Sequence, residues 1–361
     1  MELCDRDYNS SSNYSTSTLL LVSVRYRDVH CYPALVICIY GVITNVINII
    51  VLTKPSMRNS INCILTGIAV ADMITMSSSI PFTYYYYIMD EEAKLTSLPW
   101  LTFLAVHMNL TLISHTSSLW LGVIMAVMRY FFVRPTARGA KTLESRSTII
   151  VIIATFLGTV LLIIPNCLAT EVVPCHNNET GKTNWHLKVP SFGQNDGNVL
   201  HTVNFFIYAV MGKIIPCTLI TFFGGLLLHT LKVANKRTRR LKGENATSNT
   251  NSQTRRTTVM LLAIIALYII SELPQSILIL LCIFVDGFFR EVYALLGDFI
   301  DLLALINSAT NFITYIAMST QYRNTLLDIS CACVHRTTCR KCGHTSALQS
   351  TKYSKTPPAP V

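Results

Sequence analysis

The sequence predicts an all-α membrane protein, folded as a seven-transmembrane helix bundle. Charged residues make up only 13% of the 361 residues, roughly half the share in an average soluble domain, and hydrophobic residues make up 51%. Long apolar segments recur, and each can cross roughly 30 Å of bilayer hydrocarbon as a helix of about 20 residues. None alternates as the strands of a membrane β-barrel do, whereas a helix satisfies its own backbone hydrogen bonds in lipid. The net charge of +10 would suit a nucleic-acid-binding protein, but the apolar content excludes a soluble one.

The distribution of Lys and Arg predicts the orientation of the chain, because these residues are enriched in cytoplasmic loops. With the N-terminus outside the cell, 21 of the 29 Lys and Arg residues lie in cytoplasmic segments. We therefore expect a multi-pass plasma-membrane protein with an extracellular N-terminus (residues 1–31), a bundle (residues 32–318) and a cytoplasmic C-terminus. The expected spans are residues 32–53, 63–89, 101–128, 148–168, 205–231, 257–285 and 292–318.

Both ends of the chain carry further signals. Asn9, Asn13 and Asn178 each begin an Asn-x-Ser/Thr sequon on the expected outer side, as glycosylation requires. The first thirty residues lack the charged-then-apolar order of a cleavable signal peptide, so we expect the first span to serve as the signal. Residues 330–361 are polar and end in Pro-rich sequence, which predicts a disordered cytoplasmic tail.

Several polar residues lie within the expected spans. The ionisable ones are Asp72, Lys213, Glu272, Asp298 and Asp301, and the uncharged ones include Asn45, Ser118, Asn307 and Asn311. Charges that face lipid are costly, so those within spans usually face the bundle interior and often carry function. The alternative is structural, since hydrogen bonds between membrane helices contribute about 0.6 kcal/mol on average. For a single Asn the structural interpretation is preferable, and for the whole group the functional one is.

Six motifs follow one another along the expected helices. They are Asn45, residues 68–72 (IAVAD), Arg129-Tyr130, Pro216, Pro274 and residues 311–315 (NFITY). In this order the chain resembles the class A (rhodopsin-like) G-protein-coupled receptors over residues 32–326. The resemblance implies contact with membrane lipid, a heterotrimeric G protein and arrestin as partners, and a short amphipathic helix 8 at residues 319–329. It also implies that Arg129, Tyr130, Pro274 and Tyr315 act in activation and G-protein coupling.

A finer resemblance is to invertebrate receptors for amidated peptides. Residues 115–121, 128–130, 213–217, 272–275 and 303–315 are similar to those of myosuppressin, FMRFamide-like and sex-peptide (myoinhibitory-peptide) receptors. This resemblance implies an extracellular peptide ligand of the Arg-Phe-amide type and signalling through Gi/o proteins.

The sequence departs from the class A pattern next to Arg129 and in its sixth helix. Met128 stands where most of these receptors carry an acid, so Arg129 lacks its usual carboxylate partners and we expect a loosely held inactive state. Glu272 stands where most carry the tryptophan of the sixth helix, and Lys213 lies at comparable depth on the fifth helix. A buried lone charge is costly and a pair is tolerable, so Lys213 and Glu272 either pair and rearrange on activation or are solvated separately in a wet cavity.

The cysteines give two modification predictions. The third helix has no cysteine at residues 99–109, so the disulfide most common in the family cannot form, and Cys175 is left to pair with Cys31 or Cys4, if it pairs. In the tail, Cys331 and Cys333 lie next to the membrane-surface helix and are candidate palmitoylation sites. Zinc ligation by tail cysteines is the alternative, but their spacing fits no standard finger.

The ligand class is predicted from two family residues that this chain lacks and from two acids that it carries. Thr111 stands where amine receptors carry an aspartate, and Leu305 where opsins carry the retinal lysine, which excludes both ligand types by resemblance. Asp298 and Asp301 share one helix face and suit a guanidinium group, which binds carboxylates bidentately. The alternative for Asp301 is a structural bond to a neighbouring helix. Candidate residues of the pocket wall are His115, Gln275, Tyr87 and Trp100.

By the same resemblance, Asp72, Ser118, Asn307 and Asn311 match the oxygen ligands of an allosteric sodium (Na+) site. Sodium bound there would favour the inactive state. No cofactor is required, and no set of residues suggests that the chain is an enzyme. Two other classes stay open: a seven-helix chemosensory receptor for a small molecule, and a membrane transporter, which would also place charges within its spans.

Overall fold

A computed structural model describes residues 14–89, 97–133, 145–168, 171–176, 183–188, 203, 206–242, 249–285, 288 and 292–342. Within these residues seven helices are long and apolar enough to cross a membrane, which confirms the predicted bundle. Their bounds are Tyr14–Leu52 (α1), Ser60–Thr83 (α2) continuing as Tyr84–Ile88 (η2), Leu98–Val133 (α3), Ser145–Leu168 (α4), Tyr208–Ile214 (η6) continuing as Ile215–Lys242 (α6), Asn249–Phe284 (α7) and Ala294–Met318 (α8).

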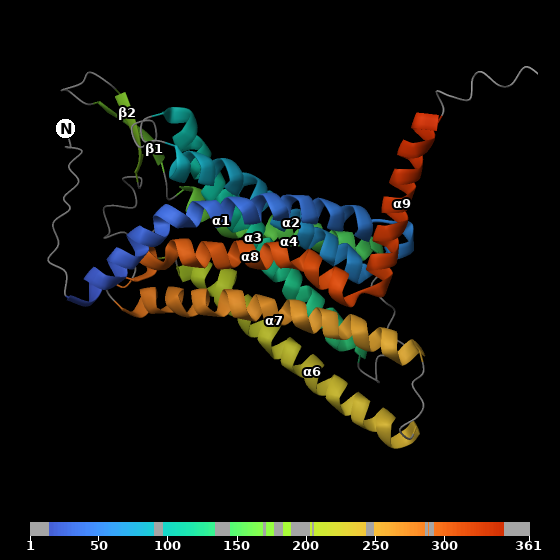
Figure 1. Cartoon of the computed structure of the whole chain (residues 1–361). Helices are drawn as coiled ribbons and strands as arrows, with labels where there is room; N and C mark the ends of the chain where they lie inside the picture. The colour runs from blue at the N-terminus through green and yellow to red at the C-terminus, as the bar shows by residue number, and fades with distance from the viewer. Residues whose placement is uncertain are drawn as a thin grey trace, which may run out of the picture.

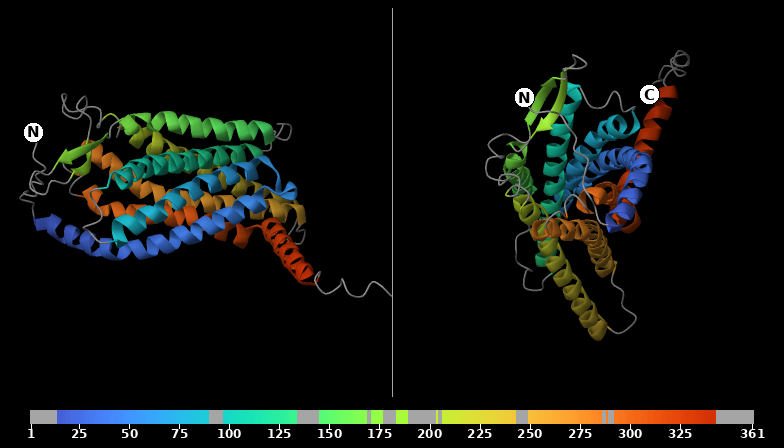
Figure 2. Two further views of the ribbon diagram at one scale, coloured as in Figure 1. Left: turned by 90° about the horizontal axis from the view of Figure 1, so that it is seen from above. Right: turned by 90° about the vertical axis from the view of Figure 1, so that its left-hand side faces the viewer.

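The helices lie side by side in an elongated bundle (Figures 1 and 2). An antiparallel hairpin of β1 (Glu171–His176) and β2 (Thr183–Lys188) lies at one end of the bundle, here called the hairpin end. At the other end, α9 (Thr320–Cys342) turns away from the long axis, and this end is called the α9 end (Figure 1). Apolar side chains of α1, α2, α3, α6, α7 and α8, together with Tyr322 of α9, form the main core. This arrangement leaves the polar residues of the spans to meet near the bundle axis.

Both α1 and α9 exceed their predicted lengths. The expected first span begins at residue 32 and the expected helix 8 ends at residue 329, but α1 begins at Tyr14 and α9 continues to Cys342. Neither extension contains a Gly or Pro that would break a helix, and Gly343 is the first glycine after the bundle. The ring of Tyr26 stacks on Phe299 of α8 at 3.6 Å between centroids, so the extension of α1 packs against the bundle.

The segment η6 is a π-helix of seven residues. Pro216 follows it and has no N–H with which to continue a regular hydrogen-bond ladder. The indole of Trp120 donates to the carbonyl of Met211 over 3.2 Å, which satisfies one group of this irregular turn. A Cβ on Gly212 would lie 2.9 Å from the ring of Tyr208, so the turn requires glycine there. The irregular turn places Lys213 in the bundle interior.

Candidate functional site

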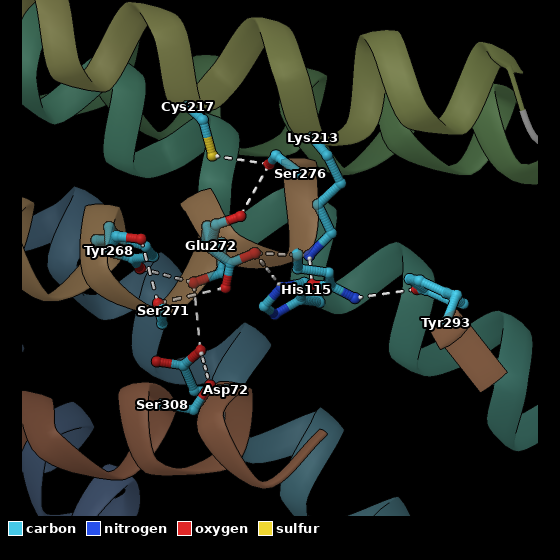
Figure 3. Close-up of polar contacts among 12 residues, drawn as sticks. Asp72, His115, Lys213, Cys217, Tyr268, Ser271, Glu272, Ser276, Tyr293 and Ser308 are labelled. Carbon is cyan, nitrogen blue, oxygen red and sulfur yellow. Dashed lines mark hydrogen bonds and ion pairs between the residues drawn. The ribbon is translucent and has the colours of Figure 1, made fainter. Parts of the chain in front are cut away.

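A buried ion pair joins η6 to α7. The ammonium of Lys213 donates to Oε2 of Glu272 over 2.6 Å, and both side chains are 1% exposed. Lys213 also donates to Oε1 of Gln275 over 2.7 Å. The ring Nε2 of His115, from α3, lies 3.1 Å from the same Glu272 oxygen (Figure 3). The structure therefore contains the pair that the sequence suggested, and it adds His115 as a third member.

The members of this cluster differ in their exposure to solvent. Lys213 and Glu272 are fully buried, whereas the side chain of His115 is 13% exposed and Gln275 is half-buried. Ser276 donates to the carbonyl of Glu272 over 2.8 Å. Among the residues bonded to the ion pair through their side chains, His115 and Gln275 are therefore the ones that a ligand could contact.

A second buried carboxylate, that of Asp72, lies deeper in the bundle. It accepts hydrogen bonds from Ser118 (3.2 Å), Ser308 (3.1 Å) and Asn311 (2.9 Å). Ser308, which the sequence analysis missed, takes the place expected for Asn307. Asn307 is also buried, but no hydrogen bond joins it to Asp72 in the described part of the chain. Ser308 and Asn311 are three residues apart and so share the face of α8 that meets α2.

Tyr268 of α7 connects the two buried acids. Its hydroxyl lies 2.9 Å from Oγ of Ser118, which binds Asp72. Its carbonyl accepts from Ser271 over 3.2 Å, and the same hydroxyl of Ser271 contacts Glu272 at 3.5 Å (Figure 3). A polar network therefore runs from the ion pair to Asp72.

The network continues to α1 and α9. Asn45 donates to the carbonyl of Ser308 over 3.3 Å, and Asn48 donates to Asn45 over 3.5 Å. The hydroxyl of Tyr322, at the start of α9, donates to Asn48 over 2.7 Å. Burial raises the pKa of the Tyr322 phenol, so the group stays protonated and donates. Tyr322 also packs against Tyr315 at 5.5 Å between ring centroids.

Two further acids lie on α8 toward the hairpin end. Asp298 accepts from the hydroxyl of Tyr87 over 2.8 Å. Asp301 is exposed, although it lies within electrostatic range of Tyr87, Tyr208 and Lys213. Asp301 is therefore accessible as a residue and lies near polar groups of η2 and η6. Among the described residues, neither acid forms an ion pair.

Aromatic side chains gather beside these acids. Trp100 stacks on Tyr85 at 3.6 Å between centroids and accepts a hydrogen bond on its carbonyl from Tyr86 over 2.7 Å. The guanidinium of Arg27 lies 5.6 Å from the centre of the Tyr87 ring. Trp100 thus packs directly against η2, and Tyr87 is the candidate wall residue in contact with an acid.

Comparison with known proteins identifies the family. The model of the "serpentine type 7TM GPCR chemoreceptor Srw" family matches residues 32–333. The chain is a seven-transmembrane G-protein-coupled receptor of this family. It is 30% identical to "G-protein coupled receptor dmsr-1" of Caenorhabditis elegans, over 83% of this chain and 67% of that protein. It is 25% identical to the sex peptide receptor of Drosophila melanogaster, over 83% of this chain and 71% of that one. It is 23% identical to the FMRFamide receptor of the same fly, over 81% of this chain and 52% of that receptor.

The α9 end of the receptor carries the residues expected to meet a G protein. Nε of Arg129 is buried without a hydrogen-bond partner, and no acid among the described residues pairs with this arginine. Tyr130 lies beside Phe223 of α6 at 5.9 Å between ring centroids. Pro274 lies inside α7 two residues after Glu272. These positions are compatible with the roles that the resemblance implies, which remain predictions.

The structure bears on one of the cysteine predictions. Cys31 has a free thiol, so the suggested disulfide with Cys175 is absent. The thiol is buried and donates to the carbonyl of Asp28, in its own helix, at 3.7 Å. Cys4 and the side chain of Cys175 lie outside the described residues, as do Asn9, Asn13 and Asn178. On α9, Cys331 is free and exposed, and the side chain of Cys333 lies outside the described residues.

Proposed function

We propose that this receptor binds an extracellular neuropeptide that ends in Arg-Phe-amide, and that it signals through Gi/o proteins. The observation that carries the proposal is the accessible position of Asp301 near the hairpin end, within electrostatic range of Lys213 and Tyr208. A carboxylate with no ion-pair partner among the described residues is suited to a guanidinium, which binds it through charge-assisted hydrogen bonds. Asp298, one turn away, would complete an acidic subsite for the arginine.

The names of two relatives support a peptide ligand. Two of them are called the sex peptide receptor and the FMRFamide receptor. For the ligand to arrive from outside, the hairpin end and the N-terminus must be extracellular, as the distribution of Lys and Arg predicts. The G protein would then meet the α9 end, around Arg129.

Inhibition of cAMP formation in cells that express the receptor tests this proposal. The panel contains peptides ending in Arg-Phe-amide and the same peptides as free acids. We expect a response to amidated forms, and we expect Asp301→Asn to raise the effective concentration about 10- to 100-fold, since a hydrogen bond to a charged group contributes about 1.5–3 kcal/mol. Asp28→Asn, an exposed acid on α1, is the matched control. An unchanged response of Asp301→Asn would contradict the arginine subsite.

The second candidate is a chemosensory receptor for a small molecule, which the description of the matching family favours. Silence across the peptide panel, with receptor present at the cell surface, would support this candidate instead. A response to small cationic molecules that Asp301→Asn abolishes would then identify the ligand class.

A further inference from the structure

The carboxamide of Gln275 is held at both of its ends. Its oxygen accepts from Lys213 over 2.7 Å, and its nitrogen donates to the hydroxyl of Tyr293 at 3.5 Å. The first contact is short and the second is at the limit of a hydrogen bond. Gln275 is half-buried, whereas Lys213 and Glu272 are fully buried. The Gln275 side chain is therefore a partly exposed group in direct contact with the buried ammonium.

The amide at the end of an amidated peptide is the same chemical group. A primary carboxamide has one carbonyl acceptor and two N–H donors, whether it belongs to glutamine or to a peptide terminus. We propose that Lys213 and Tyr293 form a subsite for a primary carboxamide, that Gln275 occupies it in the unliganded receptor, and that the C-terminal amide of an agonist replaces it. This inference rests on the proposed function. It places the C-terminal amide of the ligand beside Lys213, while Asp301 and Asp298 bind the arginine that precedes the terminal Phe.

The charges around this subsite discriminate against a free carboxylate. Glu272 already neutralises Lys213 at 2.6 Å, and Asp301 lies within electrostatic range of Lys213. A carboxylate would add a further negative charge beside two acids, and like charges close together in a medium of low dielectric repel strongly. A carboxamide makes the same contact with Lys213 without that repulsion.

If the agonist displaces Gln275, removing this side chain should change the apparent affinity in the opposite direction from removing a side chain that simply contacts the ligand. An agonist that must displace an internal group binds with an apparent affinity reduced by the fraction of receptor in which the subsite is open. Truncating the side chain removes this competition. Gln275→Ala should therefore respond to lower concentrations of agonist, whereas loss of a favourable wall contact would require higher ones.

The first experiment uses Phe-Met-Arg-Phe-amide and its free acid on cells that express each variant. We expect Gln275→Ala to lower the effective concentration of the amide at least threefold. We expect Tyr293→Phe to reduce the preference for amide over acid. Ser276→Ala is the matched control, since Ser276 is the next residue and binds the backbone of Glu272 and the thiol of Cys217. A higher effective concentration for Gln275→Ala would overturn the proposal.

A second experiment needs no peptide, and so separates failure of the subsite from failure of the proposed function. Thermal unfolding of the purified full-length receptor in detergent is measured with propionamide or propionate at equal concentration. A ligand that binds only the folded protein raises its melting temperature. We expect propionamide to stabilise Gln275→Ala more than the wild type or Ser276→Ala, and propionate to stabilise none of them selectively. Equal shifts in all three proteins would refute the carboxamide subsite, whatever the peptide panel shows.

Discussion

The ion pair of Lys213 and Glu272 gives the sharpest prediction about stability. Removing one partner of a buried pair leaves an uncompensated charge and costs about 3–5 kcal/mol, whereas replacing both by neutral groups of similar volume is often neutral. The two side chains are 1% exposed and 2.6 Å apart, so water cannot take the place of either partner. We therefore expect each single variant, Lys213→Met or Glu272→Gln, to be less stable than the double variant.

The two single variants should not be equal. Without Lys213, the carboxylate of Glu272 keeps two polar partners, the ring of His115 at 3.1 Å and the hydroxyl of Ser271 at 3.5 Å. In Glu272→Gln, the hydrogen-bond partners of the Lys213 ammonium among the described residues are neutral carboxamides, including that of Gln275 at 2.7 Å. Glu272→Gln should therefore lie near the upper end of the range of about 3–5 kcal/mol and Lys213→Met near the lower end.

The assay is thermal unfolding of the receptor in detergent, together with its amount at the cell surface. At roughly 2 °C per kcal/mol, the value for larger domains, the single variants should melt about 6–10 °C below the wild type. Lys232→Met removes an exposed lysine of α6 and should change stability by less than about 0.5 kcal/mol. If the double variant loses the sum of the two single losses, the residues act independently and the pairing argument is wrong.

The remaining predictions concern the inner part of the network and the α9 end. Asp72→Asn should abolish the effect of sodium on agonist affinity, measured by binding in NaCl and in N-methylglucamine chloride; a persisting difference would exclude a sodium site at this carboxylate. Tyr322→Phe removes only the hydroxyl bound to Asn48, and should lower stability by about 1 kcal/mol; a larger loss in the wild-type background than in an Asn48→Ala background would confirm the contact, and equal losses would refute it. Met128→Glu places an acid beside Arg129 and should lower basal G-protein signalling, which we expect to be measurable in the wild type; signalling no higher than in cells without the receptor would contradict a loosely held inactive state.

The bundle could be predicted from the sequence because each span is a long apolar run, and such a run has one stable form in lipid. The ends of the helices could not. A helix can continue beyond the predicted span as long as no residue breaks it and its side chains find partners, as Tyr26 does on Phe299. That contact joins residues far apart in the chain, so the sequence alone did not predict that α1 begins before residue 32.

The candidate site was predictable to the extent that its members are ionisable. Lys213 and Glu272 are conspicuous in apolar runs, and their similar depth beside Pro216 and Pro274 suggested the pair. Ser308 carries no such signal, because a serine within a membrane helix usually bonds to its own backbone. Its contact with Asp72 depends on the rotation of α8, which only the packed bundle determines.

The network also relates the two ends of the receptor, because Tyr268 takes part in it through both its hydroxyl and its carbonyl. The hydroxyl belongs to the Asp72 cluster and the carbonyl to the Glu272 cluster. A ligand that disturbed Glu272 and a cation that bound Asp72 would therefore both affect contacts of Tyr268. If activation moves α7 away from α3, the contact between Tyr268 and Ser118 must break, and a cation bound at Asp72 and Ser118 would change the strength of that contact. Agonist and sodium would then compete through one shared hydrogen bond, although neither ligand touches the other, since each favours a different state of the same helix.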